Sequence, residues 1–140
     1  TDIIVGFPGE TEAQFEDTLS LMEACAFDGG YLFKYSPREG TRAAREFPDD
    51  VPESVKQERL ERVIDLQRIL TSRSNKAMVG RTFEVLFTEE GSRGPDQWVG
   101  RTRGNKTVVV ESDKYLKGRM LPVDVEETGS WTLRGRLAER

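Results

Sequence analysis

The chain has 140 residues and a net charge of −4, and its 36% hydrophobic and 33% charged residues are typical of a globular protein in water. One cysteine and no histidine exclude an intrachain disulfide, a cysteine-based metal cluster and a histidine base or metal ligand. No apolar run reaches membrane-spanning length and no leader resembles a signal peptide, so we expect a cytoplasmic protein without membrane contact.

Charge differs between the two halves of the chain. Residues 1–73 carry 9 Lys and Arg against 15 Asp and Glu, whereas residues 74–140 carry 12 against 10. The first half is therefore acidic and the second mildly basic, as expected if two modules meet different partners.

The first 26 residues predict a strand, a tight turn and a helix. Residues 2–5 are an apolar, β-branched run that stops at the Gly and Pro of residues 6–9. Thr11, with Gln14 three positions later, matches a capping box and starts the helix. The apolar positions of this helix recur at helical spacing, at Phe15, Leu19, Met22 and Ala26. This order is half of a βαβ unit without its preceding strand, so the chain is expected to be truncated.

A second strand is predicted at residues 31–35, and it stops at Ser36 and Pro37. Short connections between strand, helix and strand predict parallel strands in an α/β sheet or barrel. Cys25, near the apolar stripe of the helix, is expected to be a small buried side chain. The residues after the second strand predict a loop with at most one helical turn.

A long helix is predicted from about Glu53 into the 70s, with Pro52 before it. Its apolar stripe consists of Val55, Leu60, Val63, Leu66 and Leu70. Its basic residues, expected on a solvated face, are Lys56, Arg59, Arg62 and Arg73.

From Met78 onward the pattern changes to short strands separated by turns at Gly. Five strands are predicted, at residues 82–87, 98–102, 107–111, 119–127 and 130–137. Five short strands suit a small closed β-barrel of the OB type. The predicted domain boundary lies at the end of the long helix, which gives an α/β part at residues 1–73 and an all-β part at residues 74–140.

Two loops in the first half are candidate binding sites, because loops at the carboxyl ends of parallel barrel strands build active sites. Gly6, Phe7, Pro8, Gly9 and Glu10 form the first loop, in which glycines permit close approach of a ligand to the backbone. It lacks the P-loop and dinucleotide patterns, and a plain tight turn explains it equally well.

The second loop contains Ser36, Arg38 and Thr41. The guanidinium group of Arg38 could bind a carboxylate or phosphate, and the other two residues add hydroxyls. A solvated turn is the alternative explanation for it.

Basic residues with interleaved aromatics in the second half suit RNA binding, since cations meet phosphates, amides meet base edges and rings stack on bases. The candidate RNA contacts are Arg93, Arg101, Thr102, Arg103, Asn105, Lys106 and Arg134. Trp98 and Trp131 are candidate stacking platforms, although either one alone is better explained as a core residue. The sequence offers no paired carboxylates, no nucleophile with a base and no metal-ligand set.

Taken in order, four stretches resemble the C-terminal part of the radical-SAM methylthiotransferases. The last strands and loops of that family's partial (β/α) barrel resemble TDIIVGFPGETEAQFEDT and FKYSPREGTRAA. The helix leading into the family's TRAM domain resembles DDVPESVKQERLERVIDLQ. The TRAM domain itself, a small RNA-binding β-barrel, is similar to residues 74–137.

Members of this family differ in substrate. One kind adds a methylthio group to C2 of an isopentenylated adenosine next to the tRNA anticodon, and another modifies an aspartate of a small-subunit ribosomal protein. The tRNA enzymes carry a Gly-Arg-Thr…Asn-Lys pattern, which is similar to SRGPDQWVGRTRGNKTVVVE here. The resemblance therefore favours tRNA, with the ribosomal-protein enzyme and a non-catalytic RNA-binding or docking module as alternatives.

The resemblance implies S-adenosylmethionine and two 4Fe-4S clusters in the full-length enzyme. Cys25 matches neither cluster motif, so this chain is expected to contain no catalytic residue and to be inactive alone. The resemblance also implies that residues 6–10 border the S-adenosylmethionine pocket, that residues 36–41 line the substrate mouth, and that Arg101, Asn105 and Lys106 contact tRNA. The expected partners are the tRNA anticodon stem-loop and the missing N-terminal part of the enzyme, with the chain monomeric.

Overall fold

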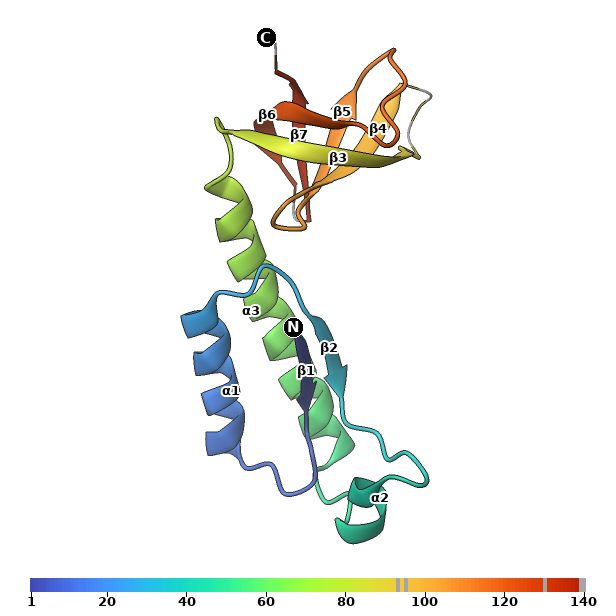
Figure 1. Ribbon diagram of the computed structural model, residues 1–140. Coiled ribbons are helices and arrows are strands. Elements are labelled where there is room, and N and C mark those ends of the chain that lie inside the picture. Colours follow the sequence, from blue (N-terminus) through green and yellow to red (C-terminus); the bar gives the residue numbers. More distant parts are fainter. Residues whose placement is uncertain (93, 95, 130, 139–140) are drawn as a thin grey trace. The chain divides into compact units, whose positions relative to one another are not determined.

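A computed structural model describes residues 1–92, 94, 96–129 and 131–138 of the chain (Figure 1). The chain divides into two compact units, Thr1–Leu70 and Thr71–Arg140. Within the described ranges, no helix combines the length and the apolar character needed to cross a membrane.

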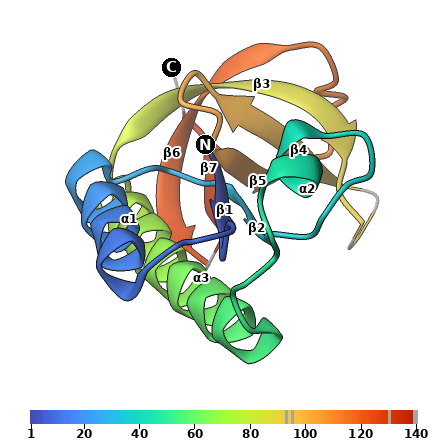
Figure 2. The ribbon, with the colours of Figure 1, turned by 90° about the horizontal axis from the view of Figure 1, so that it is seen from below.

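Two parallel strands, two complete helices and most of a long third helix build the first unit (Figures 1 and 2). Strand β1 (Asp2–Val5) pairs with β2 (Tyr31–Lys34) in parallel, with Ile3 opposite Leu32. Helix α1 (Glu12–Cys25) connects them. The predicted parallel arrangement of the two strands is therefore confirmed.

The N-terminus of α1 has the predicted capping box. The Thr11 hydroxyl accepts the Gln14 N–H at 3.3 Å, and the Gln14 side chain accepts the Thr11 N–H at 3.0 Å. The helix ends at Ala26, which is in the left-handed region with φ 48°. The expectation that Cys25 is buried is wrong: the last turn of α1 is exposed, because the buried contacts of the helix end at Met22.

Helix α2 (Arg42–Glu46) is one short turn, and α3 (Glu53–Lys76) is the predicted long helix. Apolar residues of α3 pack against β1 and α1, as the predicted stripe requires. The buried cluster of the first unit comprises Val5, Phe15, Met22, Val63 and Leu70.

The second unit contains a closed five-stranded barrel, as predicted. Its strands are β3 (Thr82–Glu90), β4 (Gln97–Thr102), β5 (Thr107–Glu111), β6 (Met120–Thr128) and β7 (Thr132–Leu137). Their order around the barrel is β3-β4-β5-β7-β6, with β5 and β7 parallel and the other pairs antiparallel. Closure leaves the sheet without free edges.

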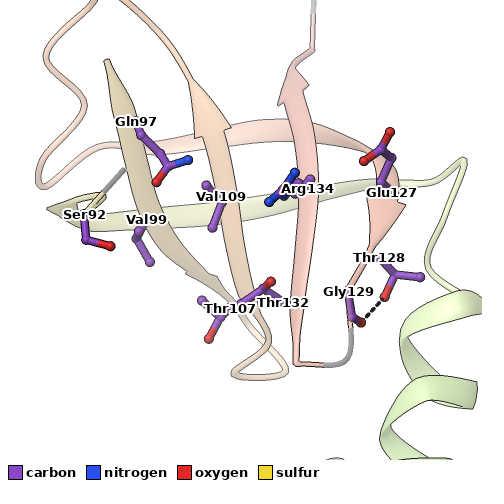
Figure 3. A pocket seen from close by; sticks show the side chains of 10 residues that line it. All are labelled: Ser92, Gln97, Val99, Thr107, Val109, Glu127, Thr128, Gly129, Thr132 and Arg134. Carbon is purple, nitrogen blue, oxygen red and sulfur yellow. Dashed lines mark hydrogen bonds between the residues drawn. The ribbon is translucent and has the colours of Figure 1, made fainter. Parts of the chain in front are cut away.

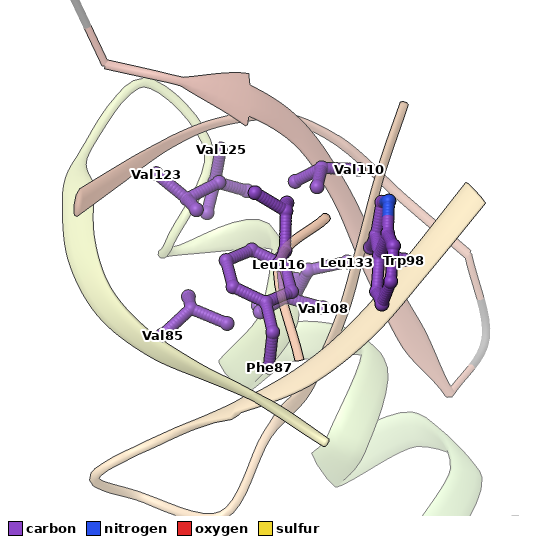
Figure 4. Close-up of a cluster of buried hydrophobic side chains, with 9 residues drawn as sticks. All are labelled: Val85, Phe87, Trp98, Val108, Val110, Leu116, Val123, Val125 and Leu133. Atoms are coloured by element: carbon purple, nitrogen blue, oxygen red, sulfur yellow. The ribbon is translucent and has the colours of Figure 1, made fainter. Parts of the chain in front are cut away.

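Alternate residues of each strand point into the barrel, where they form one apolar core (Figure 4). The strands contribute Val85, Phe87, Trp98, Val108, Val110, Val123, Val125 and Leu133 to this core, and the loop between β5 and β6 contributes Leu116. Trp98 is 3% exposed, and its indole N–H donates to the Ser112 carbonyl at 3.2 Å. Trp98 is therefore a core residue, as expected, but the same expectation is wrong for Trp131, which is 56% exposed.

Candidate functional site

The glycine loop after β1 bends sharply at two glycines in the left-handed region, Gly6 with φ 70° and Gly9 with φ 77°. The Gly6 N–H donates to Glu10 Oε1 at 2.8 Å, and the Gly9 N–H donates to Asp50 Oδ1 at 2.7 Å. Two backbone donors of this loop are therefore bound by carboxylates of the chain itself.

Arg59 of α3 holds the same loop from the helix side. The side chain of Arg59 is only 6% exposed. Its Nη1 donates to the Glu10 carbonyl at 3.0 Å and to Glu10 Oε1 at 2.8 Å, and its Nη2 donates to Glu12 Oε2 at 3.1 Å. The end of the loop and the first residue of α1 are therefore tied to one guanidinium group.

Arg62, one turn along α3, continues this ion-pair network by binding Glu12 at 2.9 Å and also Glu16. Hydrogen bonds from Arg59 and then Arg62 lower the pKa of Glu12, against a smaller opposing effect of burial. The hydrogen bond to Glu16 raises the pKa of Arg62, again against burial. Both shifts favour the charged forms of Glu12 and Arg62.

Lys56, one turn before Arg59, is 2% exposed and lies under Gly6. Its Nζ pairs with Asp49 Oδ1 at 2.5 Å and lies 5.4 Å from the centre of the Tyr35 ring. A side-chain carbon placed on Gly6 would overlap Lys56 Cγ, so this approach requires glycine.

The expectation that Lys56 and Arg59 lie on a solvated face is wrong, because both are buried against the loop acids that pair with them. The spacing of three between Lys56, Arg59 and Arg62 was the signal that could have indicated their shared face.

An aromatic cluster lies beside the glycine loop. Exposed Phe7 packs edge-on against Tyr35, with ring centres 5.1 Å apart, and its ring centre lies 6.3 Å from that of Phe47. The cluster brings together the loops that follow β1 and β2, the two loops that the sequence predicted as candidate sites.

In the second of these loops, Thr41 has a structural role. Its hydroxyl donates to the Arg38 carbonyl at 2.7 Å and accepts the Ala44 N–H at 3.3 Å, which caps α2. The side chains of Ser36 and Arg38 are exposed and leave this loop with a hydroxyl and a cation at its surface.

The predicted RNA contacts of the barrel divide into exposed and buried residues. Arg101 and Arg103 are exposed near the turn between β4 and β5, where Arg101 donates to the Asn105 carbonyl at 3.2 Å and Arg103 pairs with Glu84 at 2.9 Å. Asn105 is exposed and makes the turn in the left-handed region, with φ 60°. Arg93 lies outside the described residues.

Thr102 and Lys106 stabilise this turn from within. The buried Thr102 hydroxyl accepts the Lys106 N–H at 3.1 Å, and Lys106 itself is 8% exposed. The sequence pattern suggested that Lys106 lies beside Arg101 on the outer surface. The structure instead buries Lys106 and leaves Arg101 exposed.

A groove of about 490 Å³ runs over the outer face of the barrel (Figure 3). It is lined by Ser92, Gln97, Val99, Thr107, Val109, Glu127, Thr128, Gly129, Thr132 and Arg134. Arg134 is the predicted RNA contact that lies in it. The pairing register places Arg101 beside Thr107, and Thr107 beside Thr132, at one end of the same face.

Comparison with known proteins identifies the barrel and relates the whole chain to a group of enzymes. Residues 76–138 match the TRAM domain family. The chain is 45% identical, over 139 residues, to the tRNA-2-methylthio-N(6)-dimethylallyladenosine synthases of Moorella thermoacetica, Porphyromonas gingivalis and Symbiobacterium thermophilum. Each match covers 99% of this chain but only 31%, 30% and 29% of the respective relative.

The resemblance to the methylthiotransferases that the sequence indicated is thereby confirmed, and the chain spans about a third of the length of these relatives. The chain carries a TRAM domain and is homologous, over 139 residues, to part of the tRNA-2-methylthio-N(6)-dimethylallyladenosine synthases.

Proposed function

We propose that this chain is part of a tRNA methylthiotransferase and that its barrel binds the tRNA substrate. The observation that carries the proposal is the 45% identity, over 99% of the chain, to relatives named as synthases of 2-methylthio-N(6)-dimethylallyladenosine in tRNA. The proposed reaction adds a methylthio group to C2 of an isopentenylated adenosine next to the anticodon. A TRAM domain at residues 76–138 supports RNA as the partner.

The proposed division of labour follows the two predicted domains. Residues 1–73 are the end of a radical-SAM (β/α) barrel with its connecting helix, and residues 74–140 are the RNA-binding part. The parallel β1–α1–β2 unit supports the first assignment, because parallel strands joined by a helix are the building unit of such barrels. The proposed enzyme is a cytoplasmic monomer in which this chain joins the rest of the radical-SAM domain.

Iron–sulfur clusters do not fit the residues that this chain supplies. The sequence has one cysteine, the exposed Cys25, and the described part of the chain contains no group of His, Cys, Asp and Glu arranged to hold a metal. Cluster chemistry is therefore assigned to the rest of the proposed enzyme, and no step of it involves Cys25.

S-adenosylmethionine fits the glycine loop better, and in this family it supplies the initiating radical and the methyl group. A Cβ on Gly9 would meet no described atom within 4 Å, and the neighbouring Phe7 ring is exposed, so the loop has an open side. Gly6, Phe7, Pro8, Gly9 and Glu10 are proposed to border the cofactor there. Lys56 and Arg59 are proposed to hold this loop in shape, because Arg59 binds Glu10, which accepts the Gly6 N–H, and the Lys56 side chain lies directly against Gly6.

The proposal is tested by titrating the whole chain with an RNA hairpin that carries the sequence of an anticodon stem-loop, at several salt concentrations. We expect binding whose affinity falls as salt rises, since cations that contact phosphates release counterions. A folded chain that fails to bind the hairpin at low salt would overturn the proposal. Binding to a small-subunit ribosomal protein instead would favour the other kind of methylthiotransferase.

A further inference from the structure

The outer groove of the barrel is uneven in charge along its length. Where β4, β5 and β7 lie side by side, one row across the strands contains Arg101, Thr107 and Thr132, and the next row contains Val99, Val109 and Arg134. Neither row contains an acidic residue in these three strands, although the pairing of β7 with β6 places Glu127 opposite Arg134. Two exposed arginines therefore flank two hydroxyls and a small apolar floor.

The opposite end of this face is acidic. A second groove of about 580 Å³ adjoins the first and shares its central residues, Gln97, Val109, Glu127 and Arg134. Glu111, Glu126 and Glu127 line it, and Arg136 in it pairs with Glu126 at 3.0 Å. Beyond the shared Glu127 and Arg134, this groove adds two carboxylates, Glu111 and Glu126, and one arginine, Arg136, so like-charge repulsion directs a phosphate backbone away from it and toward Arg101.

An exposed indole stands at the basic end. Gly129 and Thr132 both line the groove, and Trp131 lies between them in the chain, with 56% of its surface exposed. Trp98, by contrast, is buried in the core. An indole that folding leaves in water, next in the chain to residues that line the groove, is a platform on which an unpaired base can stack.

The two exposed arginines are close enough to contact one short stretch of RNA. With strands about 4.8 Å apart and a rise of about 3.3 Å per residue, the Cα atoms of Arg101 and Arg134 lie on the order of 12 Å apart. Arg134 forms no ion pair with any residue that the structure describes, and the contact of Arg101 is with a neutral carbonyl. Arg101 therefore keeps its positive charge available, whereas Arg134 has Glu127 of β6 opposite it in the strand pairing and in the same groove, without an ion pair between them.

We propose that this basic end, defined by Arg101, Thr107, Thr132, Arg134 and Trp131, binds an unpaired segment of RNA. Arg101 and Arg134 contact its phosphates, the threonine hydroxyls contact its sugar–phosphate backbone, and Trp131 stacks on a base that a duplex would keep covered. This inference rests on the proposed function and specifies which face of the barrel acts and which form of RNA it takes.

The test compares binding of two probes to the whole chain, an unstructured RNA oligonucleotide and the same oligonucleotide annealed to its complement. We expect tighter binding of the unpaired probe. Trp131→Ala should weaken that binding by roughly five-fold or more, because stacking on an aromatic side chain contributes about 1–3 kcal/mol per base. Trp131→Phe, which keeps an aromatic face, should restore most of the affinity.

The arginines are tested through their salt dependence. Arg101→Gln and Arg134→Gln should each weaken binding and each lower the slope of log K against log salt by about 1, the effect of one lost phosphate contact. Lys117→Gln is the matched control, since it removes the same charge from an exposed residue of the loop between β5 and β6, outside the groove. Melting curves establish that every variant is folded.

The outcomes separate this inference from the proposed function. RNA binding that the Trp131, Arg101 and Arg134 substitutions change no more than Lys117→Gln does would overturn the inference and leave the proposed function standing. Equal affinity for the paired and unpaired probes would also overturn it. A folded wild-type chain that binds neither of these probes nor the anticodon hairpin would overturn both.

Discussion

Arg59 and Glu10 are 49 positions apart in the sequence, yet they meet in a buried ion pair with Nη1 2.8 Å from Oε1. The same carboxylate oxygen accepts the Gly6 N–H at 2.8 Å. One side chain of α3 therefore controls the carboxylate that closes the glycine loop, and substitutions on that helix should change the loop.

Removing the Arg59 side chain should destabilise the first unit. Arg59→Ala leaves the poorly exposed Glu10 carboxylate without its cation, and breaking a buried pair on one side costs about 3 kcal/mol or more. Urea denaturation, followed by circular dichroism of the helices, measures this change. Arg68→Ala, which breaks an exposed pair with Asp65, is the control and should change stability by less than about 1 kcal/mol. Equal effects of the two substitutions would contradict the assignment.

Alanine substitutions at the two left-handed glycines of the loop should differ in cost. Both Gly6→Ala and Gly9→Ala incur the backbone penalty of about 1–2 kcal/mol. Only the new methyl group at Gly6 overlaps Lys56, whereas the one at Gly9 enters open space among the described residues. The free energy of unfolding should therefore fall further for Gly6→Ala. A similar loss of unfolding free energy in both variants would mean that the Lys56 side chain moves away from the new methyl group without lowering stability.

The ion pairs of Glu12 should make the stability of the first unit depend on pH. Because hydrogen bonds from Arg59 and Arg62 lower its pKa on folding, Glu12 stabilises the folded state above its unfolded pKa of about 4.3, and that contribution is lost as pH falls through the lower folded value. The melting temperature of the wild-type chain should therefore exceed that of Glu12→Gln at neutral pH, and the difference should shrink in acid. A difference that stays constant with pH would contradict this.

Closure of the barrel should depend on Gly135. A Cβ at this position in β7 would overlap the Asp124 backbone of the neighbouring strand β6. Gly135→Ala is expected to destabilise the barrel by about 2 kcal/mol or more, a typical cost of overpacking where the backbone cannot move away. Gly104→Ala is the control, because the nearest described atom to its new methyl group is Thr102 Oγ1 at 3.8 Å. Thermal unfolding, monitored through the fluorescence of the two barrel tryptophans, compares the two variants.

Local sequence patterns were sufficient to predict most of the secondary structure. The capping box at Thr11 and Gln14, the parallel pairing of β1 with β2, and the five barrel strands were all predicted, because each depends on neighbouring residues or on a period of two along a strand. The resemblance of ordered motifs to a methylthiotransferase was likewise available from the sequence and is confirmed by the relatives.

Only the tertiary structure decided which side chains are buried and which charges are paired. Lys56 and Arg59 were expected in solvent. Instead, Arg59 pairs with Glu10, 49 positions away in the sequence, and Lys56 pairs with Asp49, 7 positions away. Lys106 and Arg101 share a sequence motif, yet the turn at Asn105 buries the first and exposes the second. The sequence by itself determined the elements and the family resemblance, since these follow from local spacing. The contacts by which Lys56 and Arg59 hold the glycine loop depend on segments that are distant in the sequence, and so does the basic end of the groove. Local spacing does not encode such contacts.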